Sequence, residues 1–354
     1  MGPLKSPAGP APGPRHDSTG QALVNRLTSP LVLAIDAGNS KTDVAIVAAD
    51  GSVLGAARGG GFNPPVVGTE TAVAGLARIV ERAAAEAGLP LDGSPLAGHV
   101  SACLANCDLP VEEQQLEIAV HDRGWGLSTH VANDTFAVLR AGVDEPRGVA
   151  VVCGAGINCV GMLPDGRTAR FPAIGRISGD WGGGAFLAEE ALWWAARAED
   201  GRGGPTALAT ALPEHFGLTS MYALIGALHL GQVPPSRKHE LTSVLFSTAE
   251  SGDPVARAIV DRQADEIVAM ATVALTRLDL LHDEAEVVLG GGVLAARRPL
   301  LLNGIAERLA VRAPKAVIRV VTAPPVLGAA LLGLDRTGAP AEAHARLRAH
   351  YAGS

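Results

Sequence analysis

Two acidic residues, each at a junction between structural segments, could take part in phosphoryl transfer. Asp36 ends an apolar run that begins at residue 31, and the polar turn GNSKT (38–42) follows it. Asp134 follows Asn133 and opens a segment with helical character. A carboxylate can hold Mg²⁺ beside phosphate oxygens or accept the proton of an attacking hydroxyl. Each acid could instead be an ordinary turn or helix cap, so these roles need support from the rest of the chain.

Two glycine-containing turns could hold phosphate, although neither matches the common nucleotide motifs. GNSKT has Ser40 where a P-loop has glycine, and an apolar β run follows where that motif requires a helix. GAGINC (154–159) has Cys159 where the dinucleotide fingerprint has its third glycine. Both turns are predicted to lie between antiparallel strands. Backbone N–H groups of such a turn can form an anion-binding concavity, with Ser40 and Thr42 as further donors, but a plain hairpin is equally compatible.

The elements around these turns occur in the same order twice. An apolar run, a glycine turn, a second apolar run, a DG turn and a third strand span residues 31–58 and again 148–171. Further strands are predicted at 97–104, 285–290 and 316–321, and helices near 70–87, 111–123, from 134, 182–199, 254–281, 299–312 and 326–351, the last interrupted at 337–340. This order predicts an α/β fold of two duplicated lobes, each a mixed five-stranded sheet flanked by helices, with the active site in the cleft between them.

Composition narrows the class of protein. A length of 354 residues favours two domains, predicted at 30–145 and 146–335, with a helix near 340–352 that could pack back on the first. Residues 1–29 are rich in Pro and Gly and are predicted to be a disordered tail. A net charge of −7 without a basic stripe argues against nucleic acid and anionic lipid as partners. No apolar run reaches the ~18 residues of a membrane helix, so we expect a cytoplasmic protein.

The four cysteines are predicted to be buried free thiols. Cys103 and Cys107 form a C-x3-C spacing and Cys153 and Cys159 a C-x5-C spacing, neither of which is the usual metal knuckle. A zinc or iron–sulfur site is the alternative.

Five segments together resemble a known superfamily. In chain order they are similar to the first phosphate motif, the segment carrying the catalytic acid, the second phosphate hairpin, the adenosine motif and the terminal helix of the sugar-kinase/actin/heat-shock-chaperone ATPases, whose lobes have the ribonuclease H-like fold. These segments are DAGNSKT (36–42), VANDTFAVLRAG (131–142), VVCGAGINCVG (151–161), VVLGGGVL (287–294) and PPVLGAALLG (324–333).

Within that superfamily the chain resembles the N-acetylglucosamine kinase branch, which is grouped with the BadF/BadG/BcrA/BcrD-type ATPases. Supporting segments are GGGFNP (59–64), PDGR (164–167) and GRISGDWGGG (175–184). The resemblance runs from about residue 30 to 335 with its motifs in order. This collinearity is more specific than any single motif.

The resemblance implies a role for each matching residue. Asp134 would be the catalytic base and Asp36 the Mg²⁺ ligand, and ATP and Mg²⁺ would be the cofactors. Phosphate contacts are implied for Gly38, Asn39, Ser40, Lys41, Thr42, Gly154, Ala155 and Gly156, and adenine contacts for Gly291 and Gly292. Sugar contacts are implied for Asn63, Asp134, Ile157, Asn158, Gly175 and Asp180. The family is often dimeric, so a homodimer is expected.

The chain departs from the family pattern around the expected sugar. Ala155 and Ile157 stand where relatives often carry Thr and Ser, and Pro65 stands where vertebrate members have an aromatic residue. Trp181 replaces the Glu of a GDEGS segment, and its indole could stack on a sugar or merely fill volume. N-acetylglucosamine, glucosamine, a muramic-acid derivative and an aminocyclitol therefore all stay open as acceptors.

The leading functional hypothesis is an ATP-dependent kinase for the 6-hydroxyl of an amino sugar, N-acetylglucosamine first among them. One alternative is an ATPase activator of a 2-hydroxyacyl-CoA dehydratase or benzoyl-CoA reductase, which would need bridging cysteines and a GGQD-like stretch that the chain lacks. Another is a non-catalytic sugar- or ATP-sensing regulator. The retained Asp36 and Asp134 argue against the regulator.

Overall fold

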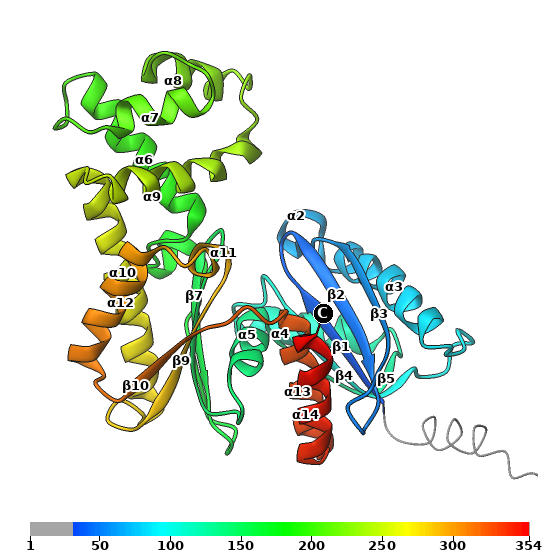
Figure 1. The fold of residues 1–354 in the computed structure, drawn as a ribbon. Coiled ribbons are helices and arrows are strands. Elements are labelled where there is room, and N and C mark those ends of the chain that lie inside the picture. Colours follow the sequence, from blue (N-terminus) through cyan, green and yellow to red (C-terminus); the bar gives the residue numbers. More distant parts are fainter. Residues whose placement is uncertain (1–30, 354) are drawn as a thin grey trace, which may run out of the picture.

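The computed structural model describes residues 31–353, so the predicted N-terminal tail lies outside the described residues. Two α/β lobes stand side by side, each built on a five-stranded mixed sheet flanked by helices (Figure 1). The first sheet has the order β3-β2-β1-β4-β5. Its strands are β1 (Val32–Ala37), β2 (Lys41–Val47), β3 (Val53–Gly60), β4 (Ala97–Leu104) and β5 (Gly126–Asn133).

The second sheet repeats this arrangement with the order β10-β9-β6-β7-β8. Its strands are β6 (Gly148–Cys153), β7 (Ile157–Met162), β8 (Thr168–Arg170), β9 (Ala285–Gly290) and β10 (Ala316–Val320). In both sheets the first strand pairs antiparallel with the second and parallel with a later strand. The predicted α/β fold with two mixed five-stranded sheets is thereby confirmed.

Strand β1 is buried on both faces, which explains its unbroken apolar sequence. Leu33 and Ile35 belong to the core beneath helix α3 (Thr69–Glu86). Val32 and Ala34 point the opposite way, into the core formed with helix α13 (Pro325–Thr337). Because side chains alternate along a strand, this pattern also fixes the face on which Asp36 lies, which is the α13 face.

Among residues 31–353, six helices lie around the first sheet, two of them come from the end of the chain, and one, α5 (Asp134–Gly142), also packs against β6 and β7 of the second sheet. They are α2 (Pro64–Val67), α3, α4 (Pro110–His121), α5, α13 and α14 (Ala341–Ala352). The predicted lobe boundary at residue 335 falls within α13, which contacts β1 and α5. Gly328 permits this contact, since a Cβ there would lie 1.8 Å from the carbonyl oxygen of Ala137.

The second lobe carries a helical extension that rises away from its sheet (Figure 1). The sequence predicted helices before residue 200 and after 253 but none between, where the structure has α7, α8 and α9. The helical elements of this lobe are η1 (Gly175–Ser178), α6 (Gly184–Glu199), α7 (Leu208–His215), α8 (Met221–His229), η2 (Pro235–Glu240), α9 (Leu241–Glu250), α10 (Pro254–Arg277), α11 (Gly292–Ala295) and α12 (Pro299–Arg312).

The structure also bears on two expectations from composition, the state of the cysteines and the presence of a membrane-spanning helix. All four cysteines are free and buried, as predicted. Burial raises the pKa of the Cys107 and Cys153 thiols to about 12. In the part of the chain that the structure describes, no helix combines the length and apolar character needed to cross a bilayer.

Candidate active site between the two lobes

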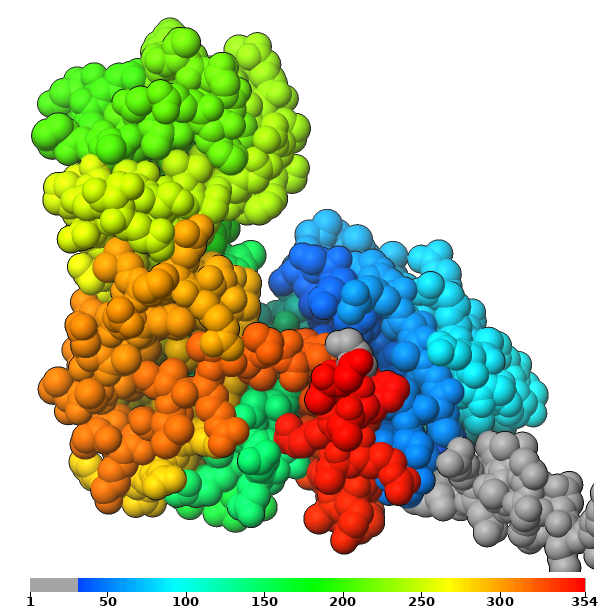
Figure 2. Space-filling view, viewed as in Figure 1, coloured from blue at the N-terminus to red at the C-terminus, as the bar shows by residue number. Residues whose placement is uncertain are grey.

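The carboxyl ends of three parallel strands bring three acids to one edge of the first sheet. Asp36 ends β1, Asp108 follows β4, and Asp134 follows β5. The register places Asp36 beside Cys103 of β4, which in turn lies beside Ala132 of β5. Such an edge is the usual binding position in open α/β sheets. The space-filling view shows the molecule hollowed between the two lobes (Figure 2).

Asp134 is the first residue of α5 and does not cap it. The N-cap is Asn133, whose side-chain oxygen accepts the Thr135 N–H at 2.9 Å. Asn133, and not the Asp134 carboxylate, is therefore the capping group of α5. Burial raises the pKa of Asp134 to about 6, against backbone hydrogen bonds that lower it. The group is thus ionised at neutral pH but close enough to its pKa to act as a base.

Asp36 lies in a crowded acidic environment and is only 6% exposed. Burial, followed by the charges of Asp134 and Asp43, raises the pKa of Asp36 to about 8, while Lys41 opposes the shift. A cation bound at this point would relieve that crowding, and oxygen donors suit Mg²⁺. Within residues 31–353, no three or more His, Cys, Asp or Glu side chains form a metal cluster, so Mg²⁺ here would depend on phosphate and water oxygens as well.

The turn at 38–42, which is predicted to bind phosphate and is here called the first phosphate turn, is tightly closed and its tip is exposed. The Gly38 N–H donates to the Lys41 carbonyl at 2.9 Å, and Asn106 donates to the Asn39 side chain at 3.0 Å. Ser40 is exposed at the tip. Lys41 is half-exposed and forms an ion pair with Asp43 at 3.5 Å. The turn can therefore present backbone and hydroxyl donors to a ligand.

The structure does not bring the Thr42 hydroxyl to this turn. Thr42 pairs with Ala37, one residue past Asp36, so its side chain lies on the opposite face of the sheet. It is fully buried beneath α3. Only the Thr42 backbone can face the cleft.

The second hairpin is supported by the start of α6. The Gly184 N–H donates to the Gly154 carbonyl at 2.7 Å, and the Ala185 N–H donates to the Ala155 carbonyl at 3.0 Å. A Cβ at Gly183 would lie 2.5 Å from the Ala155 oxygen, so glycine is required there. Gly156 is exposed at the tip. These contacts explain the glycines that follow Trp181 and hold the turn in one position.

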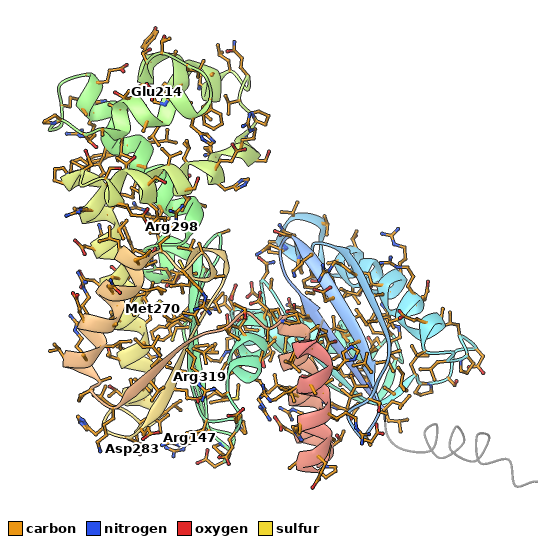
Figure 3. The ribbon with its side chains drawn as sticks, in the orientation of Figure 1. Arg147, Glu214, Met270, Asp283, Arg298 and Arg319 are labelled. Atoms are coloured by element: carbon orange, nitrogen blue, oxygen red, sulfur yellow. The ribbon has the colours of Figure 1, made fainter. Side chains whose placement is uncertain are left out.

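A cavity of about 420 Å³ adjoins this hairpin. It includes the predicted Gly154, Ala155 and Gly292, together with residues that the sequence did not single out. These additional residues are Gly184, Ala185, His239, Thr242, Ser243, Phe246, Val293, Ala296 and Arg298. The Arg298 side chain lies between the helical extension and the rest of the lobe (Figure 3). Predicted Gly291 is next to the cavity and has φ of +85°, and a Cβ there would lie 2.5 Å from the Cys153 oxygen.

Three polar side chains connect the two lobes beside Asp134. The Asn158 side-chain amide of β7 donates to the Asn133 oxygen at 3.1 Å. The Asn133 amide in turn donates to Asp108 at 2.8 Å. Asn158 is thus held against the start of α5. This places a residue that is predicted to bind the sugar next to the predicted base.

Asp108 is a candidate site residue that the sequence did not single out, because it stands two residues before Pro110, at the entrance of a predicted helix. Burial raises the pKa of Asp108 to about 7, and the charges of Asp134, Glu112 and Asp180 add to the shift. Because the charges of Asp134 and Asp180 both raise the pKa of Asp108, the Asp108 carboxyl lies within electrostatic range of both acids. The signal available in the sequence was its position after a buried strand.

The remaining residues that are predicted to bind the sugar differ in which of their atoms a ligand can reach. Asp180 is half-buried and accepts the Gly175 N–H at 3.0 Å and the Ser178 hydroxyl. Asn63 precedes α2 with its side chain making no cap bond. Ile157 is buried in the core of the second lobe, so only its backbone is available to a ligand.

Trp181 fills volume. Its side chain is 6% exposed and belongs to the core of the second lobe. Phe186 packs against it with ring centroids 5.1 Å apart, and the Arg262 guanidinium lies 4.3 Å from the ring centroid. The indole therefore presents no open face for a sugar ring.

Comparison with known proteins places this geometry in a family. The model of the BadF/BadG/BcrA/BcrD ATPase family matches residues 33–333, most of the chain. The chain belongs to this ATPase family. Membership of the BadF/BadG/BcrA/BcrD family implies the use of ATP.

Relatives of this family member include two curated kinases and a solved structure. The chain is 27% identical to N-acetylmuramic acid/N-acetylglucosamine kinase of Clostridium acetobutylicum, over 74% of this chain and 85% of the relative. It is 24% identical to N-acetyl-D-glucosamine kinase of Dictyostelium discoideum, over 87% and 99%. A Chromobacterium violaceum protein, proposed to be an N-acetylglucosamine kinase, shares the fold with a TM-score of 0.66, at 24% identity over 86% and 99% of the two chains.

Proposed function

We propose that this protein is an ATP-dependent sugar kinase that phosphorylates the 6-hydroxyl of an amino sugar, N-acetylglucosamine being the favoured acceptor. The observation that carries the proposal is the position of Asp134. It is a half-buried carboxylate at the start of α5, its charge raises the pKa of Asp36, and it lies at the edge of the sheet where the inter-lobe hydrogen bonds meet. The two curated relatives, both named as kinases of N-acetylated amino sugars, support the choice of acceptor.

The reaction divides naturally among the described residues. Asp134 accepts the proton of the sugar hydroxyl as its oxygen forms a bond to the γ-phosphorus, and the bond from that phosphorus to ADP breaks. Asp36 would hold Mg²⁺, which when bound neutralises charge on the transferred phosphate. Gly38, Asn39, Ser40 and Lys41 from one hairpin and Gly154, Ala155 and Gly156 from the other would surround the phosphates.

The sugar would lie between Asp134 and the second sheet. Asn158, already fixed by Asn133, and Asp180 would hydrogen-bond its hydroxyls, and Asn63 would approach from the first lobe. The Gly175 and Ile157 contributions would come from the backbone. Closure of the two lobes would exclude water, so that hydrolysis of ATP does not compete with transfer.

The nucleotide base would occupy the cavity beside the second hairpin. Gly154 and Gly292 line it, and the adjacent Gly291 allows the backbone to turn sharply at that point. Apolar contacts from Phe246 and Val293 suit a flat base.

The wider setting of the enzyme is also a proposal. We propose lobes divided near residue 145, a homodimer in the cytoplasm, and no nucleic-acid or membrane partner, and these rest on sequence alone. The activator alternative finds no support in the cysteines. Bridging a cluster between subunits needs accessible thiols, and all four are buried.

An ADP-release screen tests the proposal and identifies the acceptor. Purified protein with Mg·ATP is offered N-acetylglucosamine, glucosamine, N-acetylmuramic acid and an aminocyclitol, and the phosphorylated position is determined by ³¹P-coupled NMR. We expect the fastest ADP release with N-acetylglucosamine and phosphate on its 6-oxygen. ADP release with none of these sugars would favour the non-catalytic regulator instead.

A further inference from the structure

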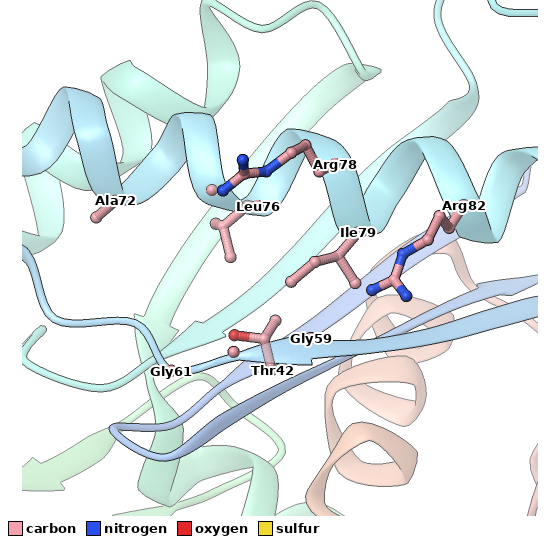
Figure 4. Close-up of a pocket in the computed structure, with 10 residues that line it drawn as sticks. Thr42, Gly59, Gly61, Ala72, Leu76, Arg78, Ile79 and Arg82 are labelled. Carbon is pink, nitrogen blue, oxygen red and sulfur yellow. The ribbon is translucent and has the colours of Figure 1, made fainter.

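A second cavity lies on the first lobe, away from the proposed active site. It has a volume of about 520 Å³ and lies between α3 and the end of strand β3, the edge strand of the first sheet (Figure 4). Thr42 lines it, so it is on the sheet face opposite to Asp36. The lining residues are Thr42, Gly59, Gly60, Gly61, Ala72, Gly75, Leu76, Arg78, Ile79 and Arg82.

Helix α3 covers the exposed backbone of β3 in a regular way that stops at this cavity. The Glu86 carboxylate accepts the Ala56 N–H at 3.1 Å, and one helical turn earlier Arg82 donates to the Arg58 carbonyl. Ala56 and Arg58 are alternate strand residues, so their backbone groups point outward from the sheet. The next outward residue is Gly60.

Arg78 lies one helical turn before Arg82, so the same spacing would bring its side chain to the backbone of Gly60. Its guanidinium nevertheless makes no hydrogen bond or ion pair with any other residue between 31 and 353. It is exposed and extends along α3 above Leu76 (Figure 4). The series of contacts between α3 side chains and the β3 backbone therefore ends before Gly60, at the position where the cavity begins.

The Thr42 hydroxyl supplies an independent sign of a missing ligand. Thr42 is 0% exposed, and its Oγ1 has no hydrogen-bond partner within the described chain. Buried hydroxyls are nearly always hydrogen-bonded, because leaving one unpaired costs free energy. Figure 4 shows the Thr42 side chain beneath Leu76 and Ile79, facing the cavity.

We propose that this cavity binds the oxyanion group of a small ligand, either a carboxylate or a phosphomonoester. Arg78 and Arg82 supply guanidinium donors, which bind such groups through paired hydrogen bonds. Thr42 and the outward backbone of Gly60 supply further donors, and Ala72, Leu76 and Ile79 contact the apolar part of the ligand. The site is separate from the proposed active site and does not depend on the proposed function.

The site is positioned to influence the proposed active site. Gly59, Gly60 and Gly61 lead directly into Phe62 and Asn63. The Phe62 N–H donates to the Gly38 carbonyl of the first phosphate turn at 2.9 Å. A ligand in the cavity thus contacts residues 59–61, the segment that connects the first phosphate turn with Asn63, which is predicted to bind the sugar.

Gly75 makes a clean test possible. It lies on α3 at the cavity wall, and a Cβ added there meets nothing within 4 Å. Gly75→Glu should therefore fold and place a carboxylate where the anion would bind. Gly75→Ala is its matched control, since alanine favours the helix and adds no charge. Arg78→Gln removes a donor, and Arg312→Gln removes an exposed positive charge elsewhere.

Isothermal titration calorimetry with inorganic phosphate and with acetate provides the measurement. Mg·ADP is kept saturating so that the nucleotide phosphate positions are already filled. We expect at least one probe to bind the wild type, and its affinity to fall about tenfold or more in Gly75→Glu and Arg78→Gln, as expected for the loss of charged hydrogen bonds. Gly75→Ala and Arg312→Gln should match the wild type.

Three outcomes would overturn the site. They are no binding of either probe to the wild type, equal binding to Gly75→Glu, or equal loss in Arg312→Gln. Thermal unfolding of each variant checks that it is folded. Kinase assays of the same variants in phosphate-free buffer keep the two proposals distinct, because failure to phosphorylate any sugar would refute the proposed function and leave the calorimetric result unaffected.

Discussion

The Asn158 side chain of the second sheet donates a 3.1 Å hydrogen bond to Asn133, the residue that caps the helix beginning with Asp134. Through this bond one lobe contacts the residue directly before the proposed base of the other. Asn133 also donates to Asp108, so the same amide group fixes an acid of the first lobe. A movement of β7 relative to the start of α5 would therefore change the surroundings of Asp134.

Replacing Asn158 with Ala should impair both sugar binding and transfer. The change removes a proposed sugar contact and leaves the Asn133 oxygen with one donor fewer. Loss of one such bond is worth about 1 kcal/mol or more, so we expect kcat/KM for the sugar to fall by roughly tenfold. Steady-state kinetics measure this, with the exposed Asn303→Ala as control. An unchanged KM would show that Asn158 does not contact the sugar.

Activity should decline on the acid side of neutrality. The pKa of Asp134 is raised to about 6 by burial, and only the ionised carboxylate can accept the hydroxyl proton. As the pH falls through about 6 the group protonates and kcat/KM should drop about tenfold per pH unit. A pH profile of kcat/KM at saturating Mg·ATP tests this. A flat profile down to pH 5 would conflict with a carboxylate of raised pKa as the base.

Asp36→Asn should stabilise the nucleotide-free protein at alkaline pH while abolishing Mg²⁺-dependent turnover. The folded pKa of Asp36 is about 8, above the 3.8 of an ordinary carboxyl. Folding therefore favours its protonated form, and stability is highest below pH 4 and is lost as the pH rises through 8. Asparagine cannot ionise, so the variant should escape this loss.

Thermal unfolding at pH 5 and pH 8.5 provides the comparison. At pH 8.5 the variant should have a Tm about 2–4 °C above the wild type, with a smaller difference at pH 5. The exposed Asp122→Asn is the control, since Asp122 does not contribute to the shift at Asp36, and it should leave the Tm unchanged at both pH values. A lower Tm for Asp36→Asn at both pH values would contradict the crowding of acids at this position.

Trp181→Leu should reduce stability far more than sugar affinity. The indole is buried against Phe186 and Arg262, and truncating a buried aromatic residue costs about 3 kcal/mol. Trp193, which is 50% exposed, is the control for loss of a surface indole. Denaturant unfolding and sugar KM should be measured together. A stable variant with a sharply raised KM would identify Trp181 as a sugar platform after all.

The sequence predicted the sheets well because their signals are local. The apolar runs, the DG turns and the Gly-rich turns of both hairpins lie within about thirty residues of each other, and the parallel strands that follow have clear apolar patterns. The helical extension gave weaker signals. Pro213 falls inside α7, and the stretch before α9 contains two prolines within a short polar segment.

The parts of the site that escaped prediction depend on long-range contacts. Phe246 of α9 reaches the hairpin at Gly154 only after the second lobe has folded, and no local pattern marks it. Asp108 resembled a helix entrance until its neighbours Asn133 and Asp134 were placed beside it. The sheet face on which the Thr42 side chain lies could have been predicted from strand alternation, because Thr42 is one residue from Asp43, the partner of Asp36.

The central claim is that Asp134 is the base of a sugar kinase, and one measurement tests it most directly. ADP formation with N-acetylglucosamine and Mg·ATP is compared for the wild type and Asp134→Asn, with Mg·ADP binding measured on both and the exposed Asp122→Asn as control. We predict that Asp134→Asn loses about 10²–10⁴-fold in kcat while its affinity for Mg·ADP stays within about twofold. Turnover of Asp134→Asn close to that of the wild type would contradict the account.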